Sequence, residues 1–332
     1  MITKIVQLDI AASILRSGGL VVFPTETVYG LGASALDADA ARRIYEAKGR
    51  PCDNPLIVHF ARAEDIAQYA VVTPLAERII DAFLPAPLTL VLKKKPRMIP
   101  DTVTAGLDTV AVRVPRCETA RELIRLAGFP VAAPSANISG RPSPTTAADA
   151  IAAMNGRVDA IISGEDCEVG LESTIISFAV SGEVTLLRAG FITAEQIEEA
   201  ARVPVVRADK VADGEHPPAP GMKYRHYAPK SPLIILRGSA EAIADYVTRE
   251  AEKGGAVGFI CFGTANIPGV YTVSLGEPDD KEAHARNLFV ALNAMDARGV
   301  SVIYCADPPG GGIGEAVRER LYKASGSLLV VN

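Results

Sequence analysis

Short apolar runs alternate with helical patterns through the first two-thirds of the chain. The run GLVVFP ends at Pro24 and predicts a strand, and the next helix has Asp37 or Asp39 as its N-cap and Gly49 with Pro51 at its end. Strands are expected at residues 56–60, 89–94, 109–114, 131–135, 160–164, 173–178 and 183–188, and helices at 64–69, 74–83, 119–127, 146–154 and 194–200. Because several strands follow one another without a helix, we expect an α/β fold: a twisted mixed sheet flanked by helices.

A second pattern begins after Pro232. Its order is strand, helix, two strands, helix, strand and a glycine turn with a last helix: 233–238, 239–255, 256–263, 270–275, 282–299, 301–306 and 310–325. This βαββαβα series has about 100 residues, the size of a small Rossmann-like α/β domain. We therefore expect a catalytic domain at 1–205, a linker at 206–231 and a small C-terminal domain at 232–332.

The linker is unusual in composition. The stretch from Ala201 to Pro232 contains six prolines, and the residues from Lys223 to Tyr227 form an unbroken basic and aromatic row. A tether is normally polar and rich in Gly and Ser. The row favours a segment that folds over a site, with a mere tether as the alternative.

The composition excludes several classes of protein. A length of 332 residues favours two domains, and 48% hydrophobic with 22% charged residues is typical of a globular chain. There is no apolar run of about 18–20 residues and no signal peptide, so a cytoplasmic protein without a membrane role is expected. The net charge of −5 argues against non-specific nucleic-acid binding, and the five scattered cysteines predict buried free thiols.

Two glycine-rich stretches are weak nucleotide signals. PPGGGIGEA lacks the acidic residue that a dinucleotide fingerprint needs about 20 positions later, after a second strand, so a structural strand-to-helix turn is expected. VYGLG is not followed by GK[ST], so it is not a phosphate loop of the Walker type. We expect Gly30 and Gly32 to let the chain turn tightly after the strand.

Polar side chains interrupt otherwise apolar strands. In TVAVRV, Thr109 and Arg113 share the face opposite three valines, and an arginine there needs a salt bridge or an anionic ligand. His59 lies on a strand, either as a core residue or as a ligand, and Arg188 lies at a strand end. These positions indicate one polar sheet face.

Loops add further candidates. Lys48 and Arg50 flank the helix-ending Gly49, where two cations attract a polyanion or are simply solvated. AAPSANISGRPSP and LEST supply small residues, hydroxyls and an amide that suit a close ligand. Together these stretches predict a pocket with cations and neutral donors but no nucleophile, typical of activation chemistry on a nucleotide.

The chain resembles the YrdC-type threonylcarbamoyl-AMP synthases in a series of stretches and in their order: PTETVYGLG, KGRPCDNPL, the strand from Thr109 to Arg113, PSANISGRPSP, ESTI and LLRAG. The linker PGMKYRHYAPKSP and the domain after it resemble the long, two-domain (Sua-type) members. The resemblance implies synthesis of L-threonylcarbamoyl-AMP from L-threonine, bicarbonate and ATP, with release of pyrophosphate. The product serves the modification of the tRNA adenosine next to the anticodon, with a possible hand-over to a tRNA threonylcarbamoyl transferase, and direct tRNA binding is left open.

The resemblance also implies roles for single residues. Lys48 and Arg50 are the implied catalytic pair. The implied ATP contacts are Arg50, Asn54, Thr109, Ser135, Asn137, Ser143, Arg188 and Tyr227. The implied L-threonine contacts are Thr27, His59, Arg113, Ala133 through its backbone, and Ser173, with Thr174 as the alternative to Ser173. Mg²⁺ is expected to arrive with ATP, and no protein metal site is expected.

Two other hypotheses remain at this point. An RNA-binding module would use a basic cleft and would bind RNA in a salt-dependent way without threonine. Its residues would be Lys48, Arg50, Arg113, Arg141 and Arg188. The second hypothesis is a C-terminal domain that binds a nucleotide on its own, which the missing acidic partner disfavours.

Overall fold

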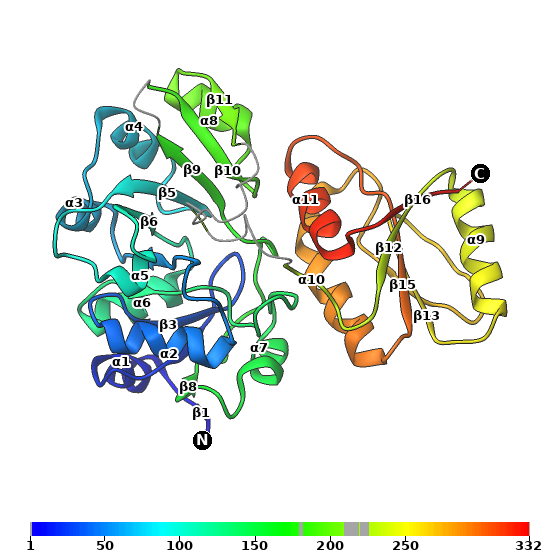
Figure 1. Cartoon of the computed structure of the whole chain (residues 1–332), viewed down its shortest axis with the longest axis horizontal. Coiled ribbons are helices and arrows are strands. Elements are labelled where there is room, and N and C mark those ends of the chain that lie inside the picture. The colour runs from blue at the N-terminus through cyan, green and yellow to red at the C-terminus, as the bar shows by residue number, and fades with distance from the viewer. Residues whose placement is uncertain (1, 179–181, 209–218, 220–225, 332) are drawn as a thin grey trace. The chain divides into compact units, whose positions relative to one another are not determined.

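The computed structural model describes residues 2–178, 182–208, 219 and 226–331 (Figure 1). Tertiary contacts divide the chain into two compact units. The first unit comprises 1–139, 144–168 and 172–224, and the second comprises 140–143, 169–171 and 225–332. Most of the expected linker, including Lys223, Tyr224 and Arg225, lies outside the described residues.

The first unit is built on a mixed sheet of eleven strands in the order β1-β8-β2-β3-β7-β4-β6-β5-β9-β10-β11 (Figure 1). The expected twisted mixed sheet is thereby confirmed. The strands are β1 (Lys4–Ile5), β2 (Val21–Phe23), β3 (Gly30–Ser34), β4 (Ile57–His59), β5 (Leu88–Lys93), β6 (Thr109–Arg113), β7 (Val131–Ala132), β8 (Ala160–Ile161), β9 (Thr174–Phe178), β10 (Val184–Arg188) and β11 (Val205–Arg207).

Most helices of the first unit lie at the predicted positions, but α1 and α5 were not predicted. Asp37 caps α2 through bonds to the backbone N–H groups of Asp39 and Ala40, and Gly49 ends the helix in the left-handed conformation. The helical segments are α1 (Leu8–Arg16), α2 (Ala38–Lys48), the 3₁₀ turn η1 (Ala63–Asp65), α3 (Ile66–Tyr69), α4 (Pro74–Phe83), α5 (Asp101–Thr104), α6 (Glu118–Ala127), α7 (Ala147–Met154) and α8 (Ala194–Ala201).

The two faces of this sheet are covered differently. Val58, Val112 and Leu90 point into a large core that includes buried residues of α2, α3, α4, α7 and α8. The opposite face packs on α1 and α6 around Val21, Phe23, Val131 and Ala160. Along β4, β5, β6 and β9 that second face instead carries Ile57, Val91, Ala111 and Ile175, which contact Ala219. This stretch is where polar side chains gather.

Gly30 and Gly32 lie in β3 rather than in a turn, so that expectation was wrong. β3 pairs antiparallel with β2, with Phe23 opposite Gly30 and Val21 opposite Gly32. A Cβ on Gly32 would lie 2.7 Å from the Phe23 ring and 2.8 Å from Val131 Cγ1. Glycine is required here because a neighbouring ring occupies the space of a side chain.

Substitution Gly32→Ala is expected to lower the free energy of unfolding by about 1–3 kcal/mol, as overpacking in a core does. Gly30→Ala is the comparator, because its nearest contact would be 3.2 Å, to Phe23 Cζ, and the loss should be smaller. Denaturant unfolding of both variants measures the difference. Equal stability of Gly32→Ala and wild type would contradict the packing argument.

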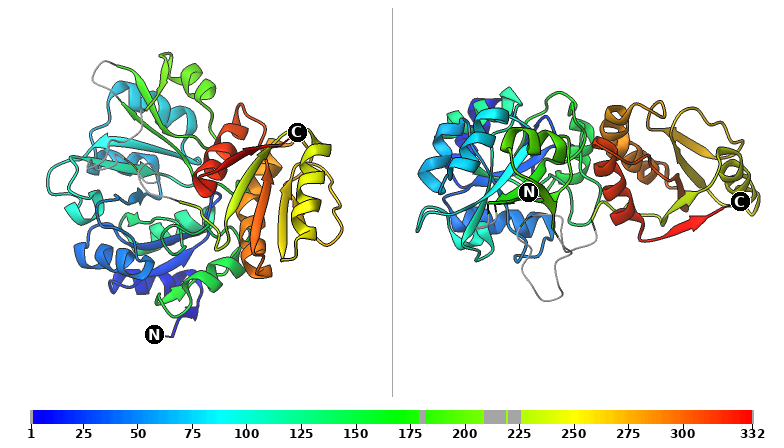
Figure 2. Two further views of the ribbon diagram at one scale, coloured as in Figure 1. Left: turned by 45° about the vertical axis from the view of Figure 1, so that its right-hand side comes forward. Right: turned by 90° about the horizontal axis from the view of Figure 1, so that it is seen from above.

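The second unit has a five-stranded parallel sheet in the order β14-β13-β15-β12-β16, with α9 on one face and α10 and α11 on the other (Figures 1 and 2). This confirms the expected small α/β domain and adds a final strand. Its elements are β12 (Leu233–Arg237), α9 (Ala240–Glu252), β13 (Val257–Cys261), β14 (Tyr271–Ser274), α10 (Lys281–Arg298), β15 (Val302–Ala306), α11 (Ile313–Ser325) and β16 (Leu328–Val330).

The glycine run at Gly310–Gly312 joins β15 to α11, as expected of a structural turn. Lys281 Nζ donates to the carbonyls of Gly310 and Gly311 at 3.0 and 3.2 Å. The run is thus fixed by a lysine of α10. All five cysteines are free, but only Cys167, Cys261 and Cys305 are buried, so the expectation of burial was wrong for the exposed Cys52.

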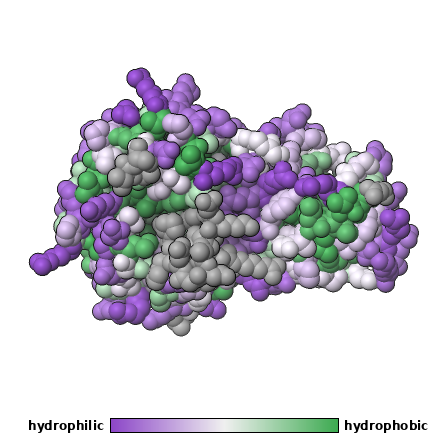
Figure 3. All heavy atoms as spheres, turned by 45° about the horizontal axis from the view of Figure 1, so that its top comes forward, coloured by the Kyte–Doolittle hydropathy of each residue, from purple (hydrophilic) through white to green (hydrophobic). Residues whose placement is uncertain are grey.

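The face in Figure 3 mixes hydrophilic side chains with smaller hydrophobic areas. No helix in the described part of the chain is long and apolar enough to cross a membrane.

Candidate active site

Five polar side chains form a continuous row across one face of the first unit's sheet. His59 on β4 lies opposite Arg113 on β6, and Arg113 lies opposite Thr89 on β5. Thr89 Oγ1 and Ser173 Oγ are 2.8 Å apart. Arg188 of β10 completes the row, donating from Nη2 to Ser173 Oγ at 3.2 Å and from Nε to the Ser173 carbonyl at 3.0 Å. The sequence predicted four of these residues and missed Thr89.

Arg113 forms an ion pair with Glu26, a residue that was not predicted from the sequence as part of the site. Its Nη2 donates to Glu26 Oε1 at 2.7 Å, and both side chains are almost fully buried. Arg113 Nε is buried and has no hydrogen-bond partner among the described residues. The guanidinium is therefore fixed along one edge, while a donor on it stays available to an anion. The sequence did contain a signal for Glu26, because it is the only carboxylate in the stretch PTETVYGLG.

Glu26 remains ionised in this setting. Burial acts to raise the pKa of its carboxyl group, but the charge and hydrogen bond of Arg113 outweigh burial and lower the pKa below 4.5. The stabilising effect of this shift is therefore present above pH 4.5 and is lost as the pH falls through the lower, folded-state pKa. At neutral pH the pair is a matched buried ion pair.

His59 is a neutral residue of the row. Burial and the nearby charge of Arg113 lower its pKa from 6.5 to about 3, and its Nδ1 donates to the Ile57 carbonyl at 3.1 Å. Its ring packs edge-on against Phe23. A neutral imidazole of this kind suits a hydrogen bond to a hydroxyl or amine better than proton transfer at neutral pH.

The imidazole of His59 is expected to stay neutral down to about pH 4. An unfolded histidine gains its proton below pH 6.5, whereas folded His59 does so only near pH 3, so this residue lowers stability as the pH falls between these values. NMR titration of the ring protons, assigned with His59→Gln, measures this. A His59 titration midpoint near pH 6.5 would contradict it.

The loop between β2 and β3 is ordered by its own hydroxyl groups. Thr25 Oγ1 donates to the Val28 carbonyl at 2.6 Å and accepts from the Thr27 N–H at 3.1 Å. Thr27 Oγ1 lies 2.8 Å from Thr25 Oγ1. Thr27 is thus held beside Glu26, within the same buried loop.

The Ser173 and Thr174 alternatives separate clearly. Thr174 is opposite Leu88, on the core face, and its hydroxyl donates to the Ile192 carbonyl at 2.6 Å. Ser173 faces the polar row. The geometry therefore favours Ser173 as a possible ligand, because the Thr174 hydroxyl is used within the core.

A second cluster gathers around Lys48, at the end of α2. Its Nζ donates to the carbonyl of Ser135 at 2.6 Å and to the carbonyl of Asn137. Burial, with a smaller effect from Arg50, lowers the pKa of Lys48 well below its usual 10.5. Lys48 therefore fixes the loop that follows β7, in which the Ser135 hydroxyl donates to the Asn137 side chain.

Arg50 holds the neighbouring loop. It donates from Nη2 to the carbonyls of Asn54 and Pro55, at 3.4 and 3.1 Å. Asn54 is 1% exposed, and its Oδ1 has no hydrogen-bond partner among the described residues. An unsatisfied buried amide oxygen is costly, so this atom is a good candidate for contact with a ligand.

Strand β7 connects the two clusters. Ala133 donates its N–H to the Ile57 carbonyl at 2.9 Å, and Gly30 forms a bridge with Ser135. The backbone of Ala133 thus lies between β4, which carries His59, and the loop held by Lys48. Thr109 lies on the same face as Arg113 at the start of β6.

Ser143 and Tyr227 belong to the second unit by their contacts. Ser143 is 1% exposed and Tyr227 is 6% exposed. Their implied contacts with ATP stay predictions, as do the ligand roles of the first unit's residues.

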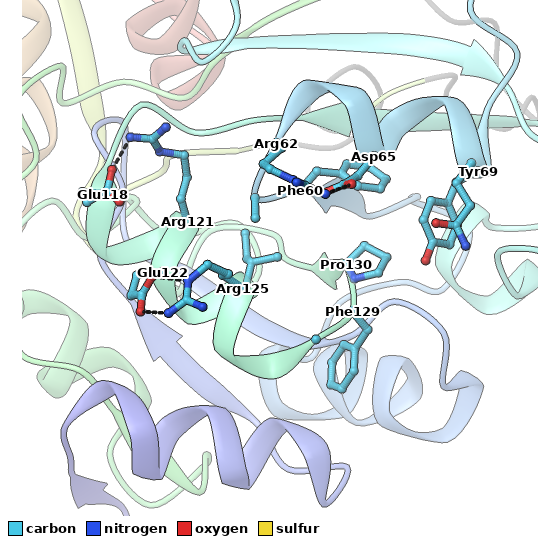
Figure 4. Close-up of a pocket in the computed structure, with 14 residues that line it drawn as sticks. Phe60, Arg62, Asp65, Tyr69, Glu118, Arg121, Glu122, Arg125, Phe129 and Pro130 are labelled. Atoms are coloured by element: carbon cyan, nitrogen blue, oxygen red, sulfur yellow. Dashed lines mark hydrogen bonds and ion pairs between the residues drawn. The ribbon is translucent and has the colours of Figure 1, made fainter.

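A different pocket, of about 600 Å³, opens between the η1–α3 segment and α6 (Figure 4). Its three arginines are each paired with an acid of the same segment: Arg62 with Asp65, Arg121 with Glu118 and Arg125 with Glu122. None of the residues that the sequence predicted for a site lines it. Its charges are compensated within the lining, which gives no preference for a nucleotide.

Three of the five cations of the RNA-binding hypothesis are buried. Lys48, Arg113 and Arg188 are 1%, 4% and 5% exposed, and each binds oxygens of the protein. A phosphate backbone needs exposed cations, so these residues do not form such a surface. Within the described residues, no group of three or more His, Cys, Asp or Glu side chains is placed to hold a metal ion.

Buried cations and ordered hydroxyl groups on one face of a mixed α/β sheet are typical of a small-molecule enzyme site that acts by positioning its substrates. Comparison with known proteins specifies the class further. The Sua5, YciO and YrdC family model, described as "Telomere recombination", matches residues 13–190. A second model, "Threonylcarbamoyl-AMP synthase, C-terminal domain", matches residues 192–326. The chain belongs to the Sua5–YciO–YrdC family, in the form with the Sua5 C-terminal domain.

Relatives support this assignment over nearly the whole chain. The threonylcarbamoyl-AMP synthase of Pyrococcus abyssi is 45% identical over 98% of this chain and 95% of its own, and that of Bacillus subtilis is 44% identical over 98% and 94%. The crystal structure of P. abyssi Sua5 complexed with L-threonine covers 100% of both chains at 42% identity, with a TM-score of 0.90. Escherichia coli YciO shares the fold of the first part, with a TM-score of 0.52 at 22% identity.

Proposed function

We propose that this chain synthesises L-threonylcarbamoyl-AMP from L-threonine, bicarbonate and ATP, releasing pyrophosphate, for modification of the tRNA adenosine next to the anticodon. The main observation in favour is the buried row of polar side chains from His59 to Arg188. In this row Arg113 is fixed by Glu26, and its Nε has no hydrogen-bond partner among the described residues. The names of the full-length relatives and the threonine complex of P. abyssi Sua5 support the same reaction.

The residues around Arg113 suit an amino acid. Its guanidinium offers a carboxylate a charged partner, and the neutral His59 and the hydroxyl of Thr27 offer hydrogen bonds to the amine or hydroxyl of threonine. Ser173 and the backbone of Ala133 border the same face. We assign this part of the site to L-threonine.

The residues around Lys48 suit a nucleotide. Cations that could contact the phosphates are supplied by Arg50 and Arg188. Neutral groups that could contact the nucleotide are supplied by the buried Asn54 oxygen and by Ser135 and Asn137, in the loop that Lys48 fixes. Thr109, Ser143 and Tyr227 are further assigned contacts. Mg²⁺ would arrive with ATP as part of the substrate.

The reaction needs no protein nucleophile. The threonine amine, after losing a proton, attacks CO₂ derived from bicarbonate and forms a carbamate. A carbamate oxygen then attacks the α-phosphorus of ATP, the bond to the β,γ-phosphates breaks, and pyrophosphate leaves. Because the carbamate decays in water, a covered site is needed. The position of Ala219, a residue of the expected linker, supports such a cover, because it is fully buried in one cluster with Ile57, Val91, Ala111 and Ile175.

Pyrophosphate release by the purified chain is expected to require both L-threonine and bicarbonate. Release is measured with each component left out in turn, and mass spectrometry identifies the adenylate. L-Serine in place of L-threonine is the matched control, because it lacks one methyl group. Release that continues unchanged without threonine would overturn the proposal. The product would pass in the cytoplasm to a tRNA threonylcarbamoyl transferase, either directly or by diffusion.

A further inference from the structure

Tyr227 is held in an unusual conformation by the second unit. Its backbone has a φ of +65°, which residues other than glycine seldom adopt. Its ring centroid lies 5.4 Å from that of Phe289 on α10, and Arg320 Cζ of α11 lies 5.7 Å from the ring centroid. The side chain is 6% exposed. Two helices of the second unit therefore fix the end of the linker by contacts on its aromatic ring.

Arg320 is the largest fully buried side chain of the described residues, at 0% exposure. Its Nη1 forms an ion pair with Glu319 Oε2 at 3.8 Å. Burying a guanidinium is costly unless charge, hydrogen bonds or an aromatic face compensate it, and the Tyr227 ring supplies such a face. The contact with the Tyr227 ring thus links a buried side chain of α11 directly to the end of the linker.

The second unit also includes two short segments that come well before the linker in the sequence, Gly140–Ser143 and Val169–Leu171. The Ala228 N–H donates to the Gly140 carbonyl at 2.8 Å. Gly170, with a φ of +75°, lies so close to α10 that a Cβ on it would be 2.4 Å from Arg286 Cα. Gly140 lies between Asn137 and Ser143, and Gly170 shortly precedes Ser173. These attachments therefore flank residues assigned to the nucleotide and threonine.

We propose that Arg320 and Phe289 are positioning residues: through Tyr227 they set the linker end and the Gly140 segment in the arrangement that nucleotide chemistry needs. This gives the C-terminal domain a function in the reaction without a ligand of its own. This positioning role rests on the proposed function only in its predictions about enzyme kinetics. The threonine contacts on β4 and β6 belong to the first unit and should be unaffected.

The first test is hydrogen exchange on the full chain, which is independent of activity. In Arg320→Met, the Ala228 amide is expected to exchange about tenfold faster or more, because its segment is released. Amides of β15 should keep their protection, which shows that the domain is folded. Arg318→Met, on the same helix but 37% exposed, is the control and should leave Ala228 protected. Unchanged protection of Ala228 in a folded Arg320→Met would overturn the proposal.

The second test is a double-mutant cycle on pyrophosphate release. Arg320→Met is expected to lower kcat/KM for ATP about tenfold, with threonine affinity by calorimetry within about twofold of wild type. Because Arg320 acts through Tyr227, adding Arg320→Met to Tyr227→Ala should cause little further loss. Arg320→Lys, which keeps a cation, should restore part of the activity. Independent, multiplied losses would overturn the proposal.

The two proposals fail differently. If wild type releases no pyrophosphate with threonine, bicarbonate and ATP, the proposed function is wrong, and hydrogen exchange alone decides the role of Arg320. If wild type is active and Arg320→Met is as active as Arg318→Met, the positioning role is wrong while the proposed function stands. Phe289→Leu provides a second variant should Arg320→Met not fold, and the same loss of Ala228 protection is expected for it.

Discussion

Replacing Arg113 by alanine is expected to weaken L-threonine binding by about 100-fold or more while ATP affinity changes little. Removing one partner of a buried, hydrogen-bonded charge pair costs about 2–5 kcal/mol in binding. Arg113 is 4% exposed and is fixed 2.7 Å from Glu26, so water cannot replace it well. Calorimetric titration of each ligand separately measures the two affinities.

The control for Arg113→Ala must separate binding from folding. The substitution leaves the Glu26 carboxylate buried without its cation, which should cost about 3–5 kcal/mol of stability. The double variant Glu26→Gln with Arg113→Met removes both charges and should recover stability but not threonine affinity. Arg116→Ala is the matched surface control, since Arg116 is 43% exposed and pairs with Glu168. Equal losses of threonine and ATP affinity in Arg113→Ala would reject the assignment.

Substitution of Lys48 by methionine is expected to reduce turnover by about 100- to 1,000-fold, the range seen when one fixed donor is removed from an active site. Lys48 donates to the carbonyls of Ser135 and Asn137, so without it the loop assigned to the nucleotide loses its support. Two buried carbonyls would lose partners, at about 1–3 kcal/mol each. Threonine affinity should stay within about threefold, since His59 and Arg113 do not contact this lysine.

The matched control is Lys95→Met. Lys95 is exposed and also donates to a backbone carbonyl, that of Ala67. It tests whether any lysine-to-carbonyl contact affects turnover. Steady-state pyrophosphate release, with thermal unfolding of both variants, supplies the measurement. A folded Lys48→Met enzyme with turnover close to wild type would show that the loop does not depend on this cation.

Side-chain periodicity predicted much of the sheet and the polar face. In TVAVRV the period of two correctly placed Arg113 and Thr109 on one side and the valines in the core, because neighbouring side chains of a strand alternate whatever the partner strand is. The cap at Asp37 and the end at Gly49 were likewise readable, since both depend on local backbone geometry. Short strands such as β1 and β16 were missed because two or three residues give no pattern.

The error at Gly30 and Gly32 has a tertiary cause. Glycine predicts a turn when only the freedom of its backbone is considered. At Gly32 in β3, however, glycine is required because the Phe23 ring and Val131 leave no space for a Cβ atom. Cys52 was misjudged for a related reason, because burial depends on which neighbours pack over a residue.

By itself, the sequence determined most of the order of strands and helices, the alternation of faces along the strands, and many of the candidate polar residues. Each of these depends on residues close together in the chain. Only the tertiary structure showed that Arg113 pairs with Glu26, that Ser173 faces the polar row while Thr174 bonds within the core, and that Tyr227 packs on Phe289 and Arg320. These contacts join residues far apart in sequence, and their energy comes from burial and charge, which exist only once the chain has folded.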